Sequence, residues 1–401
     1  PFVKLKTPVF DQTYQIDFAE TEQIDAFLRD MNGFLWLEYA EKVPLEKTEW
    51  VPNDPFILDS SQWHLTKVQS QEAWDLSTGL NSVVVAVVDD AIKLEHEDLS
   101  PNLWINSDEI DGNGIDDDGN GYIDDVNGWD AADNDNDPNP PADGTINYFT
   151  HGTLCSGIVG AVTNNGLGGG AISHNVKIMA CKGARDSDAA LSGVWAAFSY
   201  AMSNYPDAIN CSWGGNGFSQ TYQNLVNEAH NNRGIVIIAA AGNNDSTDVF
   251  YPAGYNHVIS VAASTQNDSK LGYSNFGSWI DITAPGLHIR TTAGGSNSNY
   301  KYGLGTSMAC PNVSSLVALM LSYNPGLTPD EVESCLYAGA DNIDEQNPDY
   351  IGLLGAGRIN AFNSLQCVSP TGCFIPNGLV AGNITPTSAN ITWNALSNSL
   401  S

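Results

Sequence analysis

Three short segments place an acid, a base and a nucleophile along the chain. Asp89 ends an apolar run of five valines and an alanine (83–88), His151 opens His-Gly-Thr, and Ser307 lies in Gly-Thr-Ser-Met-Ala. A hydroxyl becomes a strong nucleophile when a base within hydrogen-bond reach takes its proton and an acid orients that base. Taken singly, Asp89 is an ordinary strand-end cap and His-Gly-Thr is an ordinary turn. Together, in this order, they predict attack by serine on a carbonyl.

A fourth residue supplies the donor that such an attack requires. Asn243 ends the run Ala-Ala-Ala-Gly-Asn, and its amide is the candidate hydrogen-bond donor to the oxyanion. His151 and Ser307 each stand at the expected amino end of a helix, where partial positive charge favours a developing oxyanion. Loss of such a side-chain donor lowers turnover by about 10²–10³-fold.

The elements that position these residues form an α/β pattern from about residue 62 to 362. Strands are predicted at 83–88, 177–181, 208–211, 235–240 and 258–263, and helices after His151 and at 189–204, 220–232, 307–323 and 329–338. Continuous apolar strands separated by helices predict a parallel sheet with helices on both faces. In such sheets, ligand sites lie at the carboxyl ends of the strands, where Asp89 and Asn243 fall.

Five motifs, taken as a set, resemble those of the subtilases, the subtilisin-like serine endopeptidases. They are Val-Val-Asp-Asp-Ala-Ile with His-Glu-Asp-Leu (87–92 and 96–99), His-Gly-Thr (151–153), Asn-Cys-Ser-Trp-Gly-Gly (210–215), Ala-Ala-Gly-Asn (240–243) and Gly-Thr-Ser-Met-Ala-Cys-Pro (305–311). The order acid, base, nucleophile is that of subtilisin. The resemblance covers about residues 55–365 and implies a subtilisin-like fold in which Asp89, His151 and Ser307 are catalytic. It also implies that Asn243 completes the oxyanion hole.

The resemblance further implies a substrate-binding strand and leaves specificity open. Ser212, Trp213 and Gly214 match the strand that pairs with an extended peptide. Asp90 and Ala91 stand where the family more often has Thr-Gly. The Asp-Asp pair and Ser-Trp-Gly resemble the kexin branch and hint at cleavage after basic residues, whereas a broad preference for extended polypeptide is the alternative.

An acidic loop predicts calcium. Residues that can offer oxygen ligands stand at alternate positions of the loop, and a glycine among them permits a sharp turn. A hard cation that takes six to eight oxygen ligands is served by this spacing. The predicted ligands are Asp116, Asp118, Asn120, Tyr122 and Asp124, with Asp111 and Asn113 in the same or an adjoining cage. The match to an EF-hand loop stops at its last position, which is Asn127 rather than Glu. The alternative is a solvated acidic loop, although so many carboxylates repel one another without a counter-ion. By family resemblance, Asp98 with Asn165 or Asn164 forms a second calcium site.

The composition of the chain limits which kinds of binding partner and cofactor are expected. The formal charge of the 401 residues is −32, which argues against nucleic acid or an anionic membrane as a partner. No apolar run reaches transmembrane length, and we expect no organic cofactor. None of the seven cysteines forms a Cys-x-x-Cys pair; four are expected to be buried (Cys155, Cys181, Cys211 and Cys310), and the late group predicts one disulfide (Cys335, Cys367 and Cys373).

The sequence patterns at the two ends of the chain differ from that of the central α/β region. Residues 1–50, with alternating segments at 14–18 and 34–39 and a helical pattern at 21–31, resemble the latter part of a subtilase prodomain. We expect processing between Val43 and Pro55 and a catalytic domain over 51–366. Residues 370–401 resemble the truncated start of a fibronectin type III β-sandwich, the alternative being a disordered tail.

The sequence therefore predicts a secreted, calcium-stabilised serine endopeptidase made as a zymogen. Its expected partners are extended polypeptide substrates and its own prosegment, acting as an intramolecular inhibitor. The alternatives are a catalytically silent protein that keeps the fold for binding and a chiefly adhesive, calcium-dependent protein. A Ser307→Ala variant separates these roles from proteolysis, because it removes only the nucleophile.

Overall fold

The computed structural model describes residues 2–4, 14–16, 51–142, 149–369, 377–385 and 388–394. The chain divides into two units, one of residues 50–369 and one of residues 1–49 together with 370–401. The larger unit carries the predicted catalytic residues.

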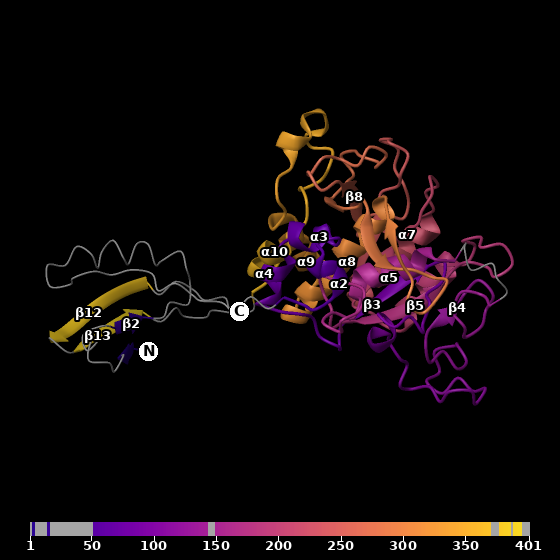
Figure 1. Cartoon of the computed structure of the whole chain (residues 1–401), viewed down its shortest axis with the longest axis horizontal. Coiled ribbons are helices and arrows are strands. Elements are labelled where there is room, and N and C mark those ends of the chain that lie inside the picture. Colours follow the sequence, from indigo (N-terminus) through magenta and orange to yellow (C-terminus); the bar gives the residue numbers. More distant parts are fainter. Residues whose placement is uncertain are drawn as a thin grey trace. The chain divides into compact units, whose positions relative to one another are not determined.

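A seven-stranded sheet forms the centre of the larger unit (Figure 1). Its order is β4-β5-β3-β6-β7-β8-β9, and every pairing is parallel. The strands are Trp129–Asp130 (β4), Lys177–Lys182 (β5), Val84–Asp89 (β3), Ala208–Cys211 (β6), Val236–Ala240 (β7), Ile259–Ser264 (β8) and Ile282–Pro285 (β9). The five predicted strands are confirmed to within a residue at each end, whereas β4 and β9 were not predicted.

Helices cover both faces of this sheet, as predicted. Alternate residues of β3 enter different cores because side chains of a strand alternate between faces. Val85 and Val87 pack in one core with α5 (His151–Gly160) and α8 (Thr306–Tyr323). Ala86 and Val88 pack in the other, with α6 (Val194–Ser203), α7 (Gln220–Asn227) and the π-helical segment η4 (Glu228–Asn232).

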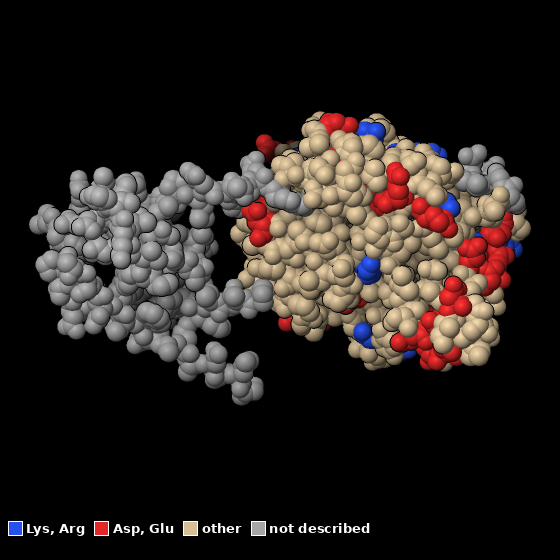
Figure 2. All heavy atoms as spheres, turned by 60° about the horizontal axis from the view of Figure 1, so that its bottom comes forward, with Lys and Arg blue, Asp and Glu red and all other residues tan. Residues whose placement is uncertain are grey.

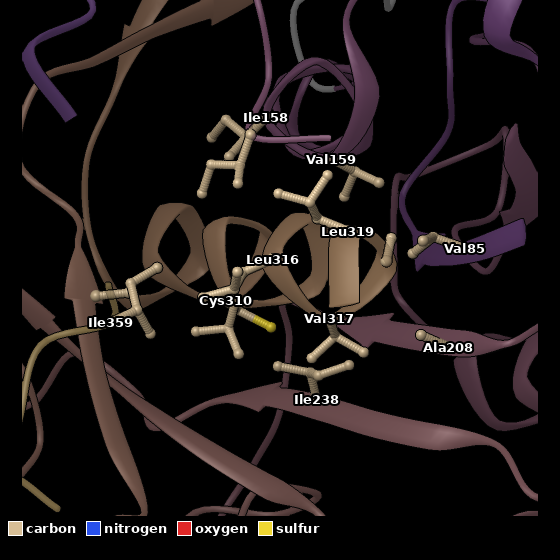
Figure 3. Packing of buried hydrophobic residues seen from close by; sticks show 14 of the residues in the cluster. Val85, Ile158, Val159, Ala208, Ile238, Cys310, Leu316, Val317, Leu319 and Ile359 are labelled. Carbon is tan, nitrogen blue, oxygen red and sulfur yellow. The ribbon is translucent and has the colours of Figure 1, made fainter. Parts of the chain in front are cut away.

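Helix α8 is buried along almost all of its length. Figure 3 shows Leu319 of α8 facing Ile158 and Val159 of α5, while Val317 points toward Ile238 of β7. A helix that is apolar on every side is stable only inside a protein, where other elements surround it. The core therefore fixes the position of the helix that bears Ser307.

Smaller elements complete the larger unit. They are α2 (Pro55–Leu58), α3 (Trp63–Lys67), α4 (Ser70–Trp74), α9 (Pro329–Ala338), α10 (Ala361–Cys367) and the antiparallel pair β10 (Ile289–Thr292) and β11 (Tyr300–Gly303). A disulfide joins Cys335 of α9 to Cys367 at the end of α10. The other four cysteines of the described residues are free and buried, as predicted, and Cys373 lies outside the described residues.

The second unit is described only through short strands. β1 (Phe2–Lys4) pairs with β2 (Tyr14–Ile16), and β12 (Asn377–Thr385) pairs with β13 (Ser388–Asn394), both antiparallel. The alternating segment predicted at 14–18 is therefore a strand over Tyr14–Ile16, and residues 370–401 include two paired strands. The predicted helix at 21–31 and strand at 34–39 lie outside the described residues.

Charge is distributed unevenly over the surface. Figure 2 shows acidic side chains in groups and Lys and Arg as scattered single residues, in keeping with 47 acidic against 15 basic residues. Within the described part of the chain, no helix combines the length and the apolar character that crossing a membrane requires.

Candidate active site

Asp89 and His151 meet at the carboxyl end of β3. Asp89 is the last residue of β3, His151 is the first of α5, and His151 Nδ1 lies 2.8 Å from Asp89 Oδ1. The carboxylate accepts a hydrogen bond, so Nδ1 carries the proton and Nε2 is left as the basic ring nitrogen. Burial lowers the pKa of His151, but the charge and hydrogen bond of Asp89 together with the neighbouring Cys155 outweigh burial and raise that pKa well above its ordinary value.

Asp90 fixes the backbone on which His151 stands. Its carboxylate accepts hydrogen bonds from the backbone N–H groups of Ala91 (2.6 Å), His151 (3.0 Å) and Gly152 (2.7 Å). Gly152 is required here, because a Cβ would lie 2.5 Å from the carbonyl oxygen of Ala91. Burial, helped by the neighbouring charge of Asp89, raises the pKa of Asp90 to about 6. From the sequence, Asp90 was only a departure from the family pattern.

Ser307 occupies the first turn of α8. Pro311 has no N–H, so the carbonyl of Ser307 is free of its usual bond within the helix. That carbonyl accepts from Ser212 Oγ (3.0 Å) and from Cys155 Sγ (3.5 Å), while Ser307 Oγ donates to the carbonyl of Ser212 (3.1 Å). The backbone of Ser307 is thus held by two side chains: Ser212, which directly follows β6, and Cys155 of α5.

Cys155 links the two helices of the site. Its Sγ lies 3.9 Å from His151 Nδ1 and contacts the carbonyl of Ser307. Burial raises the pKa of the Cys155 thiol to about 11, so it is a neutral thiol at physiological pH. The sequence analysis treated this residue as a small buried hydrophobe and missed its contact with the site; its position one helical turn after His151 was the available signal.

Asn243 lies beside the helix that carries Ser307. Its Oδ1 accepts from the backbone N–H of Thr306 (2.9 Å) and from Thr306 Oγ1 (3.2 Å). Because the Asn243 amide can accept only through its oxygen, these bonds fix its orientation and leave Nδ2 as a donor on an exposed residue. A Cβ on Gly305 would lie 3.0 Å from Asn243 Oδ1, so Gly305 permits the close approach. The structure therefore brings Asn243 next to the nucleophile's own turn.

The Ser212–Gly214 segment runs past Ser307. The indole of Trp213 is buried and donates to the carbonyl of Val88 (2.9 Å), which anchors the segment to β3. Gly214 is exposed, and a Cβ there would lie 2.4 Å from the carbonyl oxygen of Tyr251. Its neighbour Gly215 exchanges two backbone hydrogen bonds with Tyr251 (2.8 and 2.7 Å). The segment is thus an extended, anchored edge beside the nucleophile.

The acidic loop gathers a different set of carboxylates from the one predicted. Of the predicted ligands, Asp118 lies in a group with Glu109 and Asp125 whose oxygens are all within 4.8 Å of one another. Glu109 and Asp125 are buried, and burial raises the pKa of Asp125. The sequence analysis placed neither of them among the ligands, because alternate spacing selects residues of one segment and Glu109 precedes that segment.

The remaining predicted ligands of the loop shape its turns. Asp116 accepts from the N–H groups of Asn120 and Gly121, and Asp124 from those of Asn113 and Gly114. Asp111 is exposed, and the ring of Tyr122 packs edge-on against Trp129 and Tyr200. Farther along, the buried carboxylate of Asp130 pairs with buried Lys182 (2.6 Å), which compensates its charge.

The structure brings together Asp98 and Asn165, the residues predicted for a second calcium site. Asp98 Oδ1 accepts from Asn165 Nδ2 (2.8 Å), and Asp54, which was not predicted, accepts from the N–H groups of Asn164 and Asn165 (2.6 and 3.2 Å). Asp54 and Asp98 are both fully buried. Burial raises the pKa of Asp98 to about 7, and the charge of Asp54 adds to the effect. Both buried carboxylates therefore face the loop 164–169 and accept hydrogen bonds from its N–H groups.

Comparisons with known proteins agree with this geometry. Residues 81–357 match the model of the subtilase family. The thermophilic serine proteinase of Bacillus sp. (strain AK1) is 33% identical over 343 residues, covering 85% of this chain and 76% of that protein. The extracellular protease of Xanthomonas campestris pv. campestris is 37% identical over 377 residues, covering 86% of this chain and 61% of that protein.

A solved structure has the same architecture. The protease of Pseudoalteromonas arctica PAMC 21717 superposes with a TM-score of 0.66 at 28% identity, covering 80% of this chain and all of that chain. The family match spans most of the larger unit, including every strand from β3 to β9 and the segments of the candidate active site. The chain belongs to the subtilase family and is a serine endopeptidase.

Proposed function

We propose that Asp89, His151 and Ser307 are the catalytic triad and that Asn243 completes the oxyanion hole. Ser307 Oγ forms a bond to the scissile carbonyl carbon while its proton passes to His151 Nε2. Breakdown of this adduct cleaves the carbon–nitrogen bond, and His151 returns the proton to the leaving amine. Water, deprotonated by His151, then attacks the acyl carbon, and His151 gives that proton to Ser307 Oγ as the ester bond breaks. Asp89 keeps the imidazole oriented and stabilises its cationic form.

The observation that carries this proposal is the 2.8 Å contact between His151 Nδ1 and Asp89 Oδ1. It leaves Nε2 as the base, and Cys155 contacts both this ring and the carbonyl of Ser307. We assign the oxyanion donors to Asn243 Nδ2 and the backbone N–H of Ser307, because the N–H of Thr306 already donates to Asn243 Oδ1.

The test is whether the residues act as one unit. Ser307→Ala and His151→Ala should each lower kcat by about 10⁶-fold, and the double variant should lose little more, as has been measured for subtilisin. The assay is single-turnover hydrolysis of a chromogenic peptide. Additive losses, or activity retained by either single variant, would overturn the assignment.

We propose that the substrate lies as an added strand along Ser212–Gly214. Peptides are the substrates of this family, and an anchored, exposed edge suits backbone hydrogen bonding to an extended chain. Gly214→Pro should raise KM strongly, because proline removes a backbone donor and its Cβ would displace the segment from the carbonyl of Tyr251. Gly217→Pro lies outside that segment, in open space, and controls for the presence of a proline in this loop. Equal KM values for the two variants would contradict this binding mode.

Calcium fits both acidic sites by the chemistry of their donors. Asp54 and Asp98 offer carboxylate oxygens with two buried charges, and Glu109, Asp118 and Asp125 offer three carboxylates. Asn165 faces Asp98 with its Nδ2, so its amide must turn before its oxygen can join them. A bound cation would compensate the buried negative charges of Asp98 and Asp125, whose burial raises their pKa values. We assign calcium a stabilising role, distant from the bond-breaking steps.

Secretion, processing and the flanking domains belong to the same proposal. Relatives named extracellular proteases support an extracellular enzyme. Residues 1–50 are proposed as a partial inhibitory prodomain, and the antiparallel pair β12–β13 supports a fibronectin-like start over 370–401. Amino-terminal sequencing after incubation with calcium tests the processing: a new start between Val43 and Pro55 supports it, and a chain still beginning at Pro1 refutes it.

A further inference from the structure

Four metal-binding side chains converge on the surface away from the catalytic residues. They come from three segments: His230 from η4, His257 from the turn before β8, and Asp330 and Glu333 from the start of α9. Ligand atoms of His230, His257 and Asp330 all lie within 4.8 Å of one another. From His230 Nε2, Asp330 Oδ1 lies at 3.4 Å and Glu333 Oε1 at 3.9 Å.

His230 presents a buried nitrogen without a hydrogen-bond partner. Its side chain is only 5% exposed, and Nε2 has no hydrogen bond among the described residues. The other nitrogen, Nδ1, lies 3.2 Å from Asn231 Oδ1. An amide oxygen accepts, so Nδ1 carries the proton and Nε2 offers its lone pair toward the carboxylates. A histidine whose second nitrogen is fixed in this way is the usual arrangement of a metal ligand.

The second histidine is held in place by α7. Gln223 receives a hydrogen bond from the N–H of Asn256 (3.0 Å) and donates one to its carbonyl (3.2 Å). The next residue, His257, has a left-handed backbone (φ 67°), and its ring stacks on that of His230 with centroids 4.2 Å apart. A histidine in this conformation is strained, and stacked like-charged imidazolium rings would repel each other.

Asp330 and Glu333 complete the set from one face of α9. They are three residues apart, so both point to the same side of the helix. The turn that carries them is fixed by a capping box between Thr328 and Glu331. Two imidazoles and two carboxylates held on three anchored segments match the donor number and type of a tetrahedral zinc site.

We propose that His230, His257, Asp330 and Glu333 bind a divalent transition-metal ion of the zinc class. Nitrogen donors favour zinc, nickel and copper over calcium, which distinguishes this site from the two acidic sites. The ion would join the end of α7, the turn before β8 and the start of α9. The ion's role is to stabilise these segments. This proposal does not depend on the assignment of the catalytic residues.

The test compares two exposed histidines. His257→Asn removes a ligand, and His288→Asn is the control, since His288 is also exposed and left-handed (φ 52°) but lies outside the group. Asparagine tolerates that backbone, so both variants should fold. Untagged, calcium-saturated protein in a Ser307→Ala background avoids autolysis, and zinc is titrated by calorimetry and cobalt by visible absorption.

The expected result is one equivalent of zinc that His257→Asn weakens at least ~100-fold and His288→Asn leaves unchanged. Cobalt should give the intense visible bands of a four-coordinate ion, and zinc at about 100 times its Kd should raise the Tm by roughly 4 °C. Asp330→Asn should reproduce the loss. Identical zinc isotherms for His257→Asn and His288→Asn would overturn the proposal, because the bound metal would then lie elsewhere, for example at His151. Absence of zinc binding would overturn it as well, leaving an ion pair of His230 with Asp330.

Discussion

Asp90→Asn should change the pH dependence of stability by an amount that can be worked from the structure. In the folded protein the pKa of Asp90 is about 6, against an ordinary value of 3.8, because the carboxylate is buried beside Asp89. The difference of roughly two pKa units corresponds to about 3 kcal/mol. Because the folded-state pKa is raised, the folded state binds the proton more tightly than the unfolded state. Wild-type stability therefore rises as the pH falls through 6 toward 3.8.

Asparagine has no such titration, so it serves as the reference. Between about pH 8 and about pH 4.5, wild type should gain about 2 kcal/mol in unfolding free energy relative to Asp90→Asn. The variant also turns an amide N–H₂ toward the backbone N–H of His151, which offsets the difference by about 1–3 kcal/mol at every pH. Only the pH-dependent part is diagnostic of the buried charge.

The assay is urea unfolding in a Ser307→Ala background with saturating calcium. Titrating groups that do not interact with Asp90 are common to both proteins and cancel, whereas Asp89 and His151 interact with it. A constant difference between wild type and Asp90→Asn from about pH 8 to about pH 4.5 would refute the reasoning. In the active enzyme, the lost negative charge beside His151 should also lower the pKa of that histidine. The acidic limb of the kcat/KM profile should accordingly move to lower pH.

Three further predictions concern the oxyanion donor, the disulfide and calcium. Asn243→Ala should lower kcat by about 10²–10³-fold with little change in KM, the range known from subtilisin, while its exposed neighbour Asn244→Ala should retain activity; steady-state kinetics decide, and equal effects would contradict the assignment. Because the bond from Cys335 to Cys367 spans 32 residues, replacing both by serine should lower the unfolding free energy by about 3–4 kcal/mol, measured in urea, and an unchanged midpoint would count against that bond. Asp98→Asn should destabilise the calcium-loaded protein. In protein freed of calcium by a chelator at pH 8, the same change should stabilise the fold by roughly 2–4 kcal/mol, because burial of the charged carboxylate raises its pKa. Thermal unfolding measures both effects, and a change in Tm of the same sign in both states would argue against a cation there.

The sequence predicted the elements whose apolar patterns are long and continuous. β3, β5, β6, β7 and β8 are buried on both faces, so their hydrophobic runs are unbroken and easily recognised. β4 has only two residues and pairs only with β5, so its strand character comes from tertiary contact rather than from its own residues.

The sequence predicted those site residues that stand at the end of a strand or the start of a helix and whose side chains are themselves reactive. Asp89, His151, Ser307 and Asn243 each stand at such a position. Glu109 and Asp54 were missed because each is brought to its site by the tertiary fold and stands outside the local sequence pattern of the other ligands. Glu109 approaches Asp118 across the loop, and Asp54 meets Asn165 from more than a hundred positions away in the sequence. No local spacing rule connects residues of that kind.

The central claim is that the catalytic serine and histidine are an assembled pair. The most direct measurement is the intact mass of the calcium-loaded protein after reaction with a fluorophosphonate, with the adduct mapped by peptide analysis. We predict a single adduct on Ser307 in protein that begins near residue 50, and none in the His151→Ala variant. A folded protein of that length without an adduct, or an equal yield in the His151→Ala variant, would contradict the account.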